Sequence, residues 1–154
     1  MVRKLPPRKP GALGITGVAS ENLSRLPGIS FCRGGFEAKQ MWKSLKLKAK
    51  FADFLVHQEH IYGLNEGRLV CLDLETGRST WRGTNFGHGQ LLGLGEHAIV
   101  QHEDGPISVI ALNPEKETIV NEFDALEHRT WNHSVVVGNM LLVRNDREAV
   151  AFQW

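Results

Sequence analysis

Short apolar runs separated by turn-forming residues characterise the chain from Phe36 onward. The runs are rich in Val, Ile, Leu and aromatic side chains, and turn signals recur about every 8 to 12 residues. No segment carries a clean apolar stripe at helical spacing. The pattern predicts an all-β domain over residues 36–154, built as a sandwich, a barrel or a propeller. Residues 1–35 contain all the prolines except Pro106 and Pro114 and show neither period, which predicts an irregular or disordered tail.

The stretch LVCLDLETGRSTW, residues 69–81, predicts one strand, a tight turn and a return strand. Asp73 ends the first strand, and its carboxylate can accept hydrogen bonds from backbone N–H groups of the turn. Thr76 continues the turn, and Gly77 suits a position with positive φ. Trp81 falls on the return strand, where a large ring can fill the space between two sheets.

Similar strands recur at a spacing near 40 residues. The runs are LVCLD at 69–73, SVIALN at 108–113 and AVAFQ at 149–153, which place Cys71, Ala111 and Ala151 in line. Trp81 has counterparts in Trp42 and Phe123 at about the same spacing. Four short strands in each unit of about 40 residues predict the blades of a β-propeller.

We expect a partial β-propeller of about three four-stranded blades, the last one incomplete. The predicted strands are 52–57, 60–64, 68–73 and 78–82 in blade one; 88–93, 97–102, 106–112 and 118–123 in blade two; and 132–137, 140–144 and 147–152 in blade three. Residues 37–42 are predicted as the outer strand of a blade that has no other strands.

On these residues the chain resembles the quinoprotein-like (pyrroloquinoline-quinone-type) β-propeller repeat family. Cys71–Gly77 and Trp81 match the family's repeat of a small residue, Leu, Asp, two variable residues, Thr-Gly, three variable residues and Trp. Three further stretches look like C-terminal blades of bacterial propellers of this kind: Tyr62-Gly63-Leu64, Gly87-His88-Gly89 and Thr130-Trp131-Asn132-His133. The resemblance covers about residues 36–154, and it implies a fold rather than an activity.

The family's enzymes bind pyrroloquinoline quinone and calcium in a central funnel and oxidise alcohols or sugars. They use carboxylate and amide metal ligands, a catalytic Asp, a Trp floor and often two adjacent cysteines. This chain has no adjacent cysteines, and no Glu, Asn and Asp set matches in position. The resemblance therefore implies the non-catalytic branch, whose members serve as scaffolds, such as the lipoprotein propeller of the outer-membrane assembly machine. We expect no cofactor, with the quinone plus calcium as the alternative.

The composition is that of one globular domain, since 154 residues include 42% apolar and 23% charged side chains. A net charge of +1 gives no electrostatic case for binding nucleic acid, and the basic stretches 1–10 and 43–50 are interpreted as a tail and a solvated strand face. No apolar run is long enough to predict a membrane-spanning helix. Cys32 and Cys71 suggest no disulfide framework. A poor apolar segment argues against a signal peptide and favours the cytoplasm, although similar family members are periplasmic or extracellular.

The histidines offer few chemical sites. His57 and His60 flank a predicted turn and could face one ion, but no third ligand is evident, so a polar turn is favoured over zinc. His88 and His133 fall at the start of a blade's first strand, near the propeller axis. They could line a central surface, or they could bond to neighbouring loop carbonyls.

Nucleophilic catalysis finds no support either. Combinations of Ser79, Ser108 or Ser134 with a histidine and Asp73, Asp104 or Asp146 can be assembled, but none lies in a nucleophile elbow. We therefore assign no catalytic and no metal-binding residues.

The aromatic residues Trp42, Trp81, Phe123 and Trp131 are predicted to pack between blades. Blade three lacks an outer strand whereas residues 37–42 supply one, so two or three copies could complete a ring by lending this strand. The alternative is a fragment of a longer propeller. The sequence favours a protein-binding or scaffold module over a remnant or subunit of a quinone-dependent oxidoreductase, and a dye-reduction assay with calcium and the quinone separates these two hypotheses.

Overall fold

The computed structural model describes residues 29–32 and 35–154, and these residues form antiparallel β-sheets without a helix. Blade one contains β3 (Phe54–His57), β4 (His60–Asn65), β5 (Arg68–Asp73) and β6 (Ser79–Asn85). Blade two contains β7 (Gln90–Leu94), β8 (His97–Gln101), β9 (Ile107–Ala111) and β10 (Thr118–Phe123). Blade three contains β11 (Val135–Val137), β12 (Met140–Arg144) and β13 (Ala149–Gln153).

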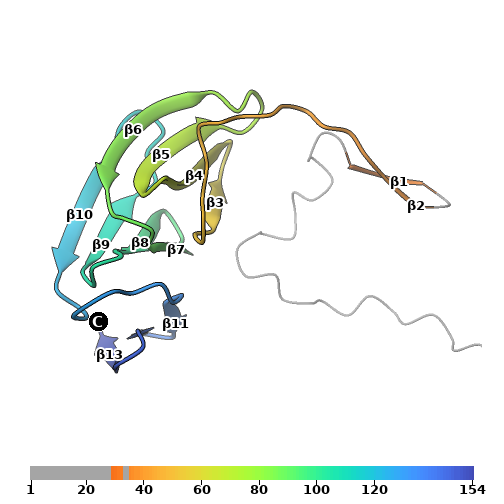
Figure 1. Cartoon of the computed structure of the whole chain (residues 1–154). Helices are drawn as coiled ribbons and strands as arrows, with labels where there is room; N and C mark the ends of the chain where they lie inside the picture. Colours follow the sequence, from red (N-terminus) through yellow and green to blue (C-terminus); the bar gives the residue numbers. More distant parts are fainter. Residues whose placement is uncertain (1–28, 33–34) are drawn as a thin grey trace, which may run out of the picture.

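In each blade the strands pair in the order in which they occur along the chain. Figure 1 shows the three sheets fanned in an arc, with β3, β7 and β11 on the inner side and β6 and β10 on the outer side. The prediction of an all-β partial propeller with an incomplete last blade is confirmed.

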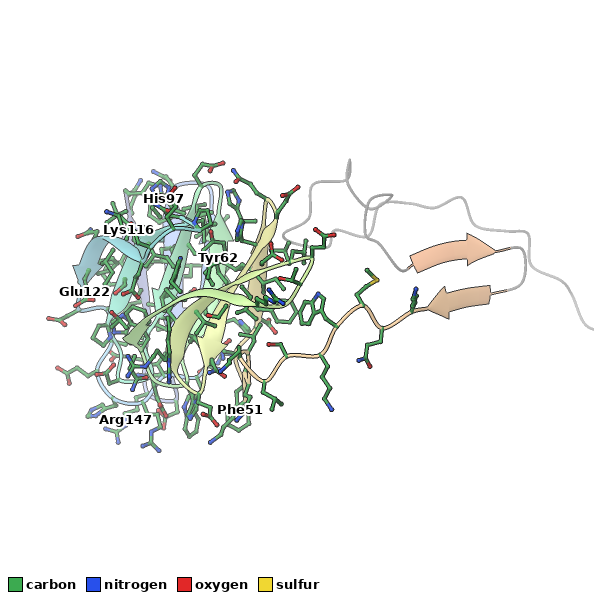
Figure 2. The ribbon with its side chains drawn as sticks, turned by 90° about the horizontal axis from the view of Figure 1, so that it is seen from above. Phe51, Tyr62, His97, Lys116, Glu122 and Arg147 are labelled. Atoms are coloured by element: carbon green, nitrogen blue, oxygen red, sulfur yellow. The ribbon has the colours of Figure 1, made fainter. Side chains whose placement is uncertain are left out.

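The N-terminal part differs from the prediction. β1 (Ile29–Cys32) and β2 (Gly35–Ala38) pair as a separate two-stranded sheet, and Figure 2 shows this hairpin projecting away from the blades. A strand over 37–42 is therefore wrong, because residues 39–53 form no strand. The physical reason is the lack of a neighbouring sheet: β2 finds its hydrogen-bond partner in the residues just before it. Of the predicted tail, residues 29–32 lie in β1 and Gly35 lies in β2, and the other residues lie outside the described part of the chain.

Two-residue turns fix the start of each middle strand. The strand pairs meet at His57↔His60, Leu94↔His97 and Val137↔Met140. The first turn residue has positive φ in each case, at Gln58 (51°), Gly95 (59°) and Gly138 (60°). These turns match the right-handed twist of the strands, so the second residue of each middle strand occupies the same place in its blade.

This register corrects the 40-residue alignment of the third strands. Leu72 pairs with Ile61 and Ile110 pairs with Ala98, so these two residues are equivalent. In blade three the partner of Leu141 is Phe152, so Phe152 is the equivalent of Leu72 and Ile110. Ala151, the partner of Leu142, is then in line with Cys71 as predicted, whereas Ala111 pairs with His97 and the equivalent residue of blade two is Val109. The equivalent residues Cys71, Val109 and Ala151 are 38 and 42 positions apart, because the segments that connect the strands differ in length between blades, so a fixed step of 40 places Ala111 two residues out of line. A shift of two leaves each side chain on its original face of the sheet.

Apolar clusters fill the spaces between the sheets. The cluster between blades one and two contains Leu64, Leu69, Phe86, Leu91, Ala98, Val100 and Ile110, with Trp81 packed against it. The cluster between blades two and three contains Ile99, Ile107, Leu126, Leu141 and Val143, with Phe123 and Phe152 packed against it. A third cluster contains Ile61, Val70 and Leu72, with Trp42 and Leu47 packed against it. It lies on the face of blade one that points away from blade two, which we call the front face.

The two tryptophans Trp42 and Trp81 make equivalent contacts. Trp81 Nε1 donates to the carbonyl of Asn113 and Trp42 Nε1 donates to the carbonyl of Leu74, both at 2.9 Å and both 32 residues further along the chain. Phe123 instead packs edge to face on Phe152, with ring centroids 5.2 Å apart. Trp81 and Phe123 thus lie between successive blades, and Trp42 occupies the equivalent position on the face of blade one that points away from blade two.

The turn after β5 fits around one of these rings. The backbone N–H of Thr76 donates to Asp73 Oδ1 at 2.7 Å, and the bonds from Thr76 hold the pKa of the Asp73 carboxyl below its usual value. Gly77 has φ of 67°, and a Cβ there would lie 2.6 Å from the Trp42 ring. Gly77 therefore serves both the turn and the packing of Trp42.

Replacement of Trp81 by Ala should lower the free energy of unfolding by about 3 kcal/mol, because it leaves a cavity between blades one and two. Trp81→Phe retains most of the packing but leaves the Asn113 carbonyl without its donor, so a loss of about 1 kcal/mol is expected. Urea unfolding followed by circular dichroism measures both. Trp154→Ala is the control, since Trp154 is 58% exposed and its loss should change stability by less than about 0.5 kcal/mol. Equal effects of Trp81→Ala and Trp154→Ala would contradict the packing role.

Candidate functional site

The two histidines predicted near the axis lie in different surroundings. His88 is half-buried in the connection between β6 and β7, and its backbone N–H donates to Glu103 Oε2 at 2.9 Å. The His133 side chain is 56% exposed, and its Nε2 lies 3.7 Å from Asp53 Oδ2. Asp53 precedes β3 and His133 precedes β11, so this contact links blade one to blade three across the inner side.

Gln90 joins all three blades at the same inner side. This side chain lies at the start of β7 and is 1% exposed. Its Nε2 donates to the carbonyl of Phe51 at 2.9 Å and to the carbonyl of Trp131 at 3.1 Å. The sequence interpretation missed Gln90. An amide at the start of an apolar strand was the available signal, since such a buried group needs hydrogen-bond partners.

Glu103 is a second link between blades, in the loop between β8 and β9. Its Oε2 accepts the bond from His88, and its Oε1 accepts from Trp131 Nε1 at 3.0 Å. Arg129 Nε lies 3.7 Å from the same Oε1, and the Arg129 guanidinium carbon lies 5.2 Å from the centroid of the Trp131 ring. The backbone bond from His88, followed by the bond from Trp131, holds the pKa of the Glu103 carboxyl below its usual value. Trp131, predicted to pack between blades, is 50% exposed and takes part in this polar arrangement.

An open cleft of about 680 Å³ lies beside Glu103. Residues 85–87, 102–104 and 128–129 line it, so it is formed by the loops that follow β6, β8 and β10. The Glu103 carboxylate already accepts two hydrogen bonds within the protein. The bonds from His88 and Trp131 therefore hold the Glu103 carboxylate in place at the side of the cleft.

Ser108 and His102 belong to the combinations of serine, histidine and aspartate that the sequence allows, and they lie next to each other behind this cleft. His102 Nε2 lies 2.7 Å from Ser108 Oγ, and Ser108 Oγ donates to Glu122 Oε2 at 2.7 Å. The serine oxygen must then accept from His102 Nε2–H, which is the reverse of the proton direction that a nucleophile needs. Ser108 is also fully buried. The arrangement is a structural hydrogen-bond chain and not a hydrolytic triad.

Burial lowers the pKa of His102, against an opposite effect of the Glu122 and Asp104 carboxylates. The imidazole also packs against the Phe86 ring, with centroids 4.6 Å apart. His102 thus connects the outer strand of blade two to the apolar cluster between blades one and two.

His57 and His60 are directly paired across the β3–β4 turn. His57 Nε2 lies 3.1 Å from Glu96 Oε2, which belongs to the corresponding turn of blade two. Within the residues that the structure describes, no group of three or more His, Cys, Asp or Glu side chains could hold a metal ion.

Blade three presents an exposed apolar face, formed by Val135 (49% exposed), Val137 (53%), Met140 (40%) and Leu142 (39%). We call this set the open face. The residues equivalent to Leu142 in the other blades are Tyr62 and Ile99, which are 1% and 2% exposed. Figure 2 shows Tyr62 in the interior of the fan. The outer edge of β13 also has no strand partner among the described residues. The described part of the chain contains no helix long and apolar enough to span a membrane.

One of the comparisons with known proteins supports the architecture. No protein-family model matches the chain, and no curated protein matches it. Among solved structures, BamB from Moraxella catarrhalis aligns with a TM-score of 0.52 at 17% identity over 65% of this chain and 32% of the BamB chain. The chain has a β-propeller fold. It spans about a third of the length of BamB, and the likeness concerns the fold alone. The computationally designed Ika4 protein aligns with a TM-score of 0.44 at 10% identity over 73% of this chain and 99% of the designed chain. The quinoprotein-like nature of the repeats stays a prediction.

Glu103→Gln should lower the urea midpoint at pH 7, because an amide cannot accept both N–H groups in place of the carboxylate. A carboxyl with a lowered pKa stabilises the fold above its ordinary value of 4.5 and loses this contribution as the pH falls through the folded value. The difference between wild type and variant should therefore shrink below about pH 4.5. Urea unfolding from pH 7 to pH 3 measures it.

Glu66→Gln is the matched control for this experiment. Glu66 lies in the corresponding loop of blade one, and its N–H bonds to Lys48 as that of Glu103 bonds to Phe86. Its side chain is 56% exposed and makes only a 3.7 Å ion pair with Lys48. An equal, pH-independent difference for both variants would contradict the account of Glu103.

Proposed function

We propose that the chain is a non-catalytic propeller-repeat module that binds another protein through blade three. The observation that carries this proposal is the open face: Val135, Val137, Met140 and Leu142 are exposed at positions where a propeller sheet faces its neighbour. Exposed apolar patches of this kind mark interaction surfaces in soluble proteins.

The shape of the open face suggests the class of partner. Val135 pairs with Leu142 and Val137 pairs with Met140, so the four side chains form one flat surface on two adjacent strands. The preferred occupant is a second β-sheet packed face to face at about 10 Å. Fully burying a Val, Leu or Met side chain contributes about 1.5–3 kcal/mol, so covering four half-exposed ones supplies several kcal/mol toward binding.

The edge of β13 supplies a second contact. The N–H and C=O groups along this edge have no ladder partner among the described residues. Addition of a strand here would give blade three the four strands that blades one and two possess. Face and edge together favour a partner that contributes both a sheet and a strand.

The polar groups on the loop side favour a structural role. Glu103 and Gln90 bind backbone or indole N–H and carbonyl groups of neighbouring blades. Ser108 is buried in a chain of hydrogen bonds. These contacts support a scaffold, in which polar side chains fix the blades, over a catalyst.

Leu142→Asp should weaken binding of the partner at least about tenfold, because it places an unpaired carboxylate in the centre of an apolar interface. Immobilised wild-type chain is exposed to lysate, retained proteins are identified by mass spectrometry, and the identified protein is purified and titrated by calorimetry against each variant. Leu94→Asp is the matched control, since Leu94 is 40% exposed against 39% for Leu142 but lies on β7 of blade two. A partner whose affinity is the same for both variants would contradict the proposal.

A further inference from the structure

We infer that the protein bound by blade three is a second copy of this chain, and that two copies close one six-bladed ring. This inference rests on the proposed function and names its partner. Blade three of each copy would stand in front of blade one of the other copy. Three features of the described residues support it. They are a segment placed like a strand but without a sheet, a sheet without its outer strand, and an exposed apolar strip on blade one that complements the open face.

The first feature is the segment Met41–Leu47, which lies on blade one as Thr80–Phe86 lies on blade two. Residues 41–46 alternate between exposed and half-buried in the same pattern as residues 80–85, and both segments end in an inward residue, Leu47 or Phe86. The Trp42 and Trp81 indoles also make the same bond to a carbonyl 32 residues further on. Residues 80–85, however, belong to β6 and pair with β5, whereas residues 41–46 pair with no strand. Met41–Lys46 therefore has the placement of an outer strand whose blade is absent.

The second feature is the free edge of β13, and the repeat gives its expected register. In blade one, Cys71 pairs with Trp81 and Val70 pairs with Arg82. Cys71 corresponds to Ala151, because their partners Tyr62 and Leu142 are each the third residue of a middle strand. The equivalent pairs across the junction would be Ala151 with Trp42 and Val150 with Lys43.

The third feature is an exposed apolar strip on the front face of blade one. Phe54 and Val56 are 55% and 43% exposed. Leu91, which occupies the place of Phe54 in blade two, is only 4% exposed because blade one covers it. On the other side of the proposed junction, the open face presents Val135 and Val137 on the innermost strand of blade three. Stacking blade three on blade one would bury both sets, as stacking blade one on blade two buries Leu91.

The number of copies follows from the number of blades. Propellers close with typically four to eight blades. Three blades in the described residues of each copy give about six for two copies and about nine for three, so two copies fit this range. A head-to-tail contact that closes after two copies gives a two-fold axis along the centre of the ring and two identical junctions.

Sedimentation equilibrium of the full 154-residue chain should give twice its mass of 17.2 kDa. Leu142→Asp should reduce the mass to that of one chain, whereas Leu94→Asp should leave it doubled. A wild-type monomer across the concentration range would overturn the inference. A monomer that still binds a different protein in a Leu142-dependent way would overturn only this inference, whereas a monomer with no such partner would also remove the proposed function.

Cysteine crosslinking tests the register directly. A Lys43→Cys chain and a Val150→Cys chain, both carrying Cys32→Ser and different tags, are co-expressed, purified and oxidised. Directly paired strand residues have Cα atoms about 4.5–5.5 Å apart, within the range of a disulfide. A covalent dimer containing both tags is expected, and neither chain alone should crosslink.

Val120→Cys replaces Val150→Cys in the control mixture, since Val120 is 55% exposed on the outer strand of blade two. Crosslinking of Lys43→Cys to Val120→Cys at an equal yield would overturn the proposed junction. A non-covalent dimer that gives no Lys43–Val150 crosslink would overturn the ring while leaving self-association through the open face.

Discussion

The structure depends on the packing of one four-stranded sheet against the next through a large side chain. A single sheet of this size has two broad faces and cannot bury both of them alone. In this chain Trp81 fills the space between blades one and two, and Phe123 with Phe152 fills the space between blades two and three. Trp42 takes the same place on the front of blade one. The repeated sequence is therefore the consequence of a repeated contact.

Polar groups complete this packing where the chain passes from blade to blade. The loop glycines Gly67 and Gly105 accept, through their carbonyls, the N–H groups of Phe86 and Leu126. Gln90 and Glu103 add side-chain bonds to residues that precede the inner strands. These bonds tie the residues that precede the inner strands of the three blades to one another.

The sequence predicted the elements wherever a turn has its own local chemistry. Asp73, Thr76 and Gly77 predict a turn whose hydrogen bonds join residues three or four positions apart, and this turn forms as expected. Residues 37–42 were predicted as a strand by their spacing from Trp81, but a strand also needs a neighbouring sheet, which spacing does not provide. The alignment of Ala111 with Cys71 and Ala151 failed for a related reason, since the segments that connect the strands differ in length between blades.

The candidate surface was less predictable than the fold. Gln90 and Glu103 bind partners 15 to 41 residues away in the chain, and a single sequence carries no pattern for such contacts. The exposure of Val135 and Leu142 depends on which sheet stands opposite them. The sequence pattern of an alternating apolar strand is the same whether its apolar face is covered or exposed. Only the arrangement of the three blades therefore distinguishes the open face from a core.

Native-state hydrogen exchange tests most directly whether inter-blade packing holds the sheets together. If it does, the slowest amides of β5 in blade one and of β9 in blade two should open with the same free energy, and Trp81→Ala should lower both by the same amount. An effect of Trp81→Ala on β5 alone, with β9 unchanged, would show that the blades are stable independently and would contradict this account.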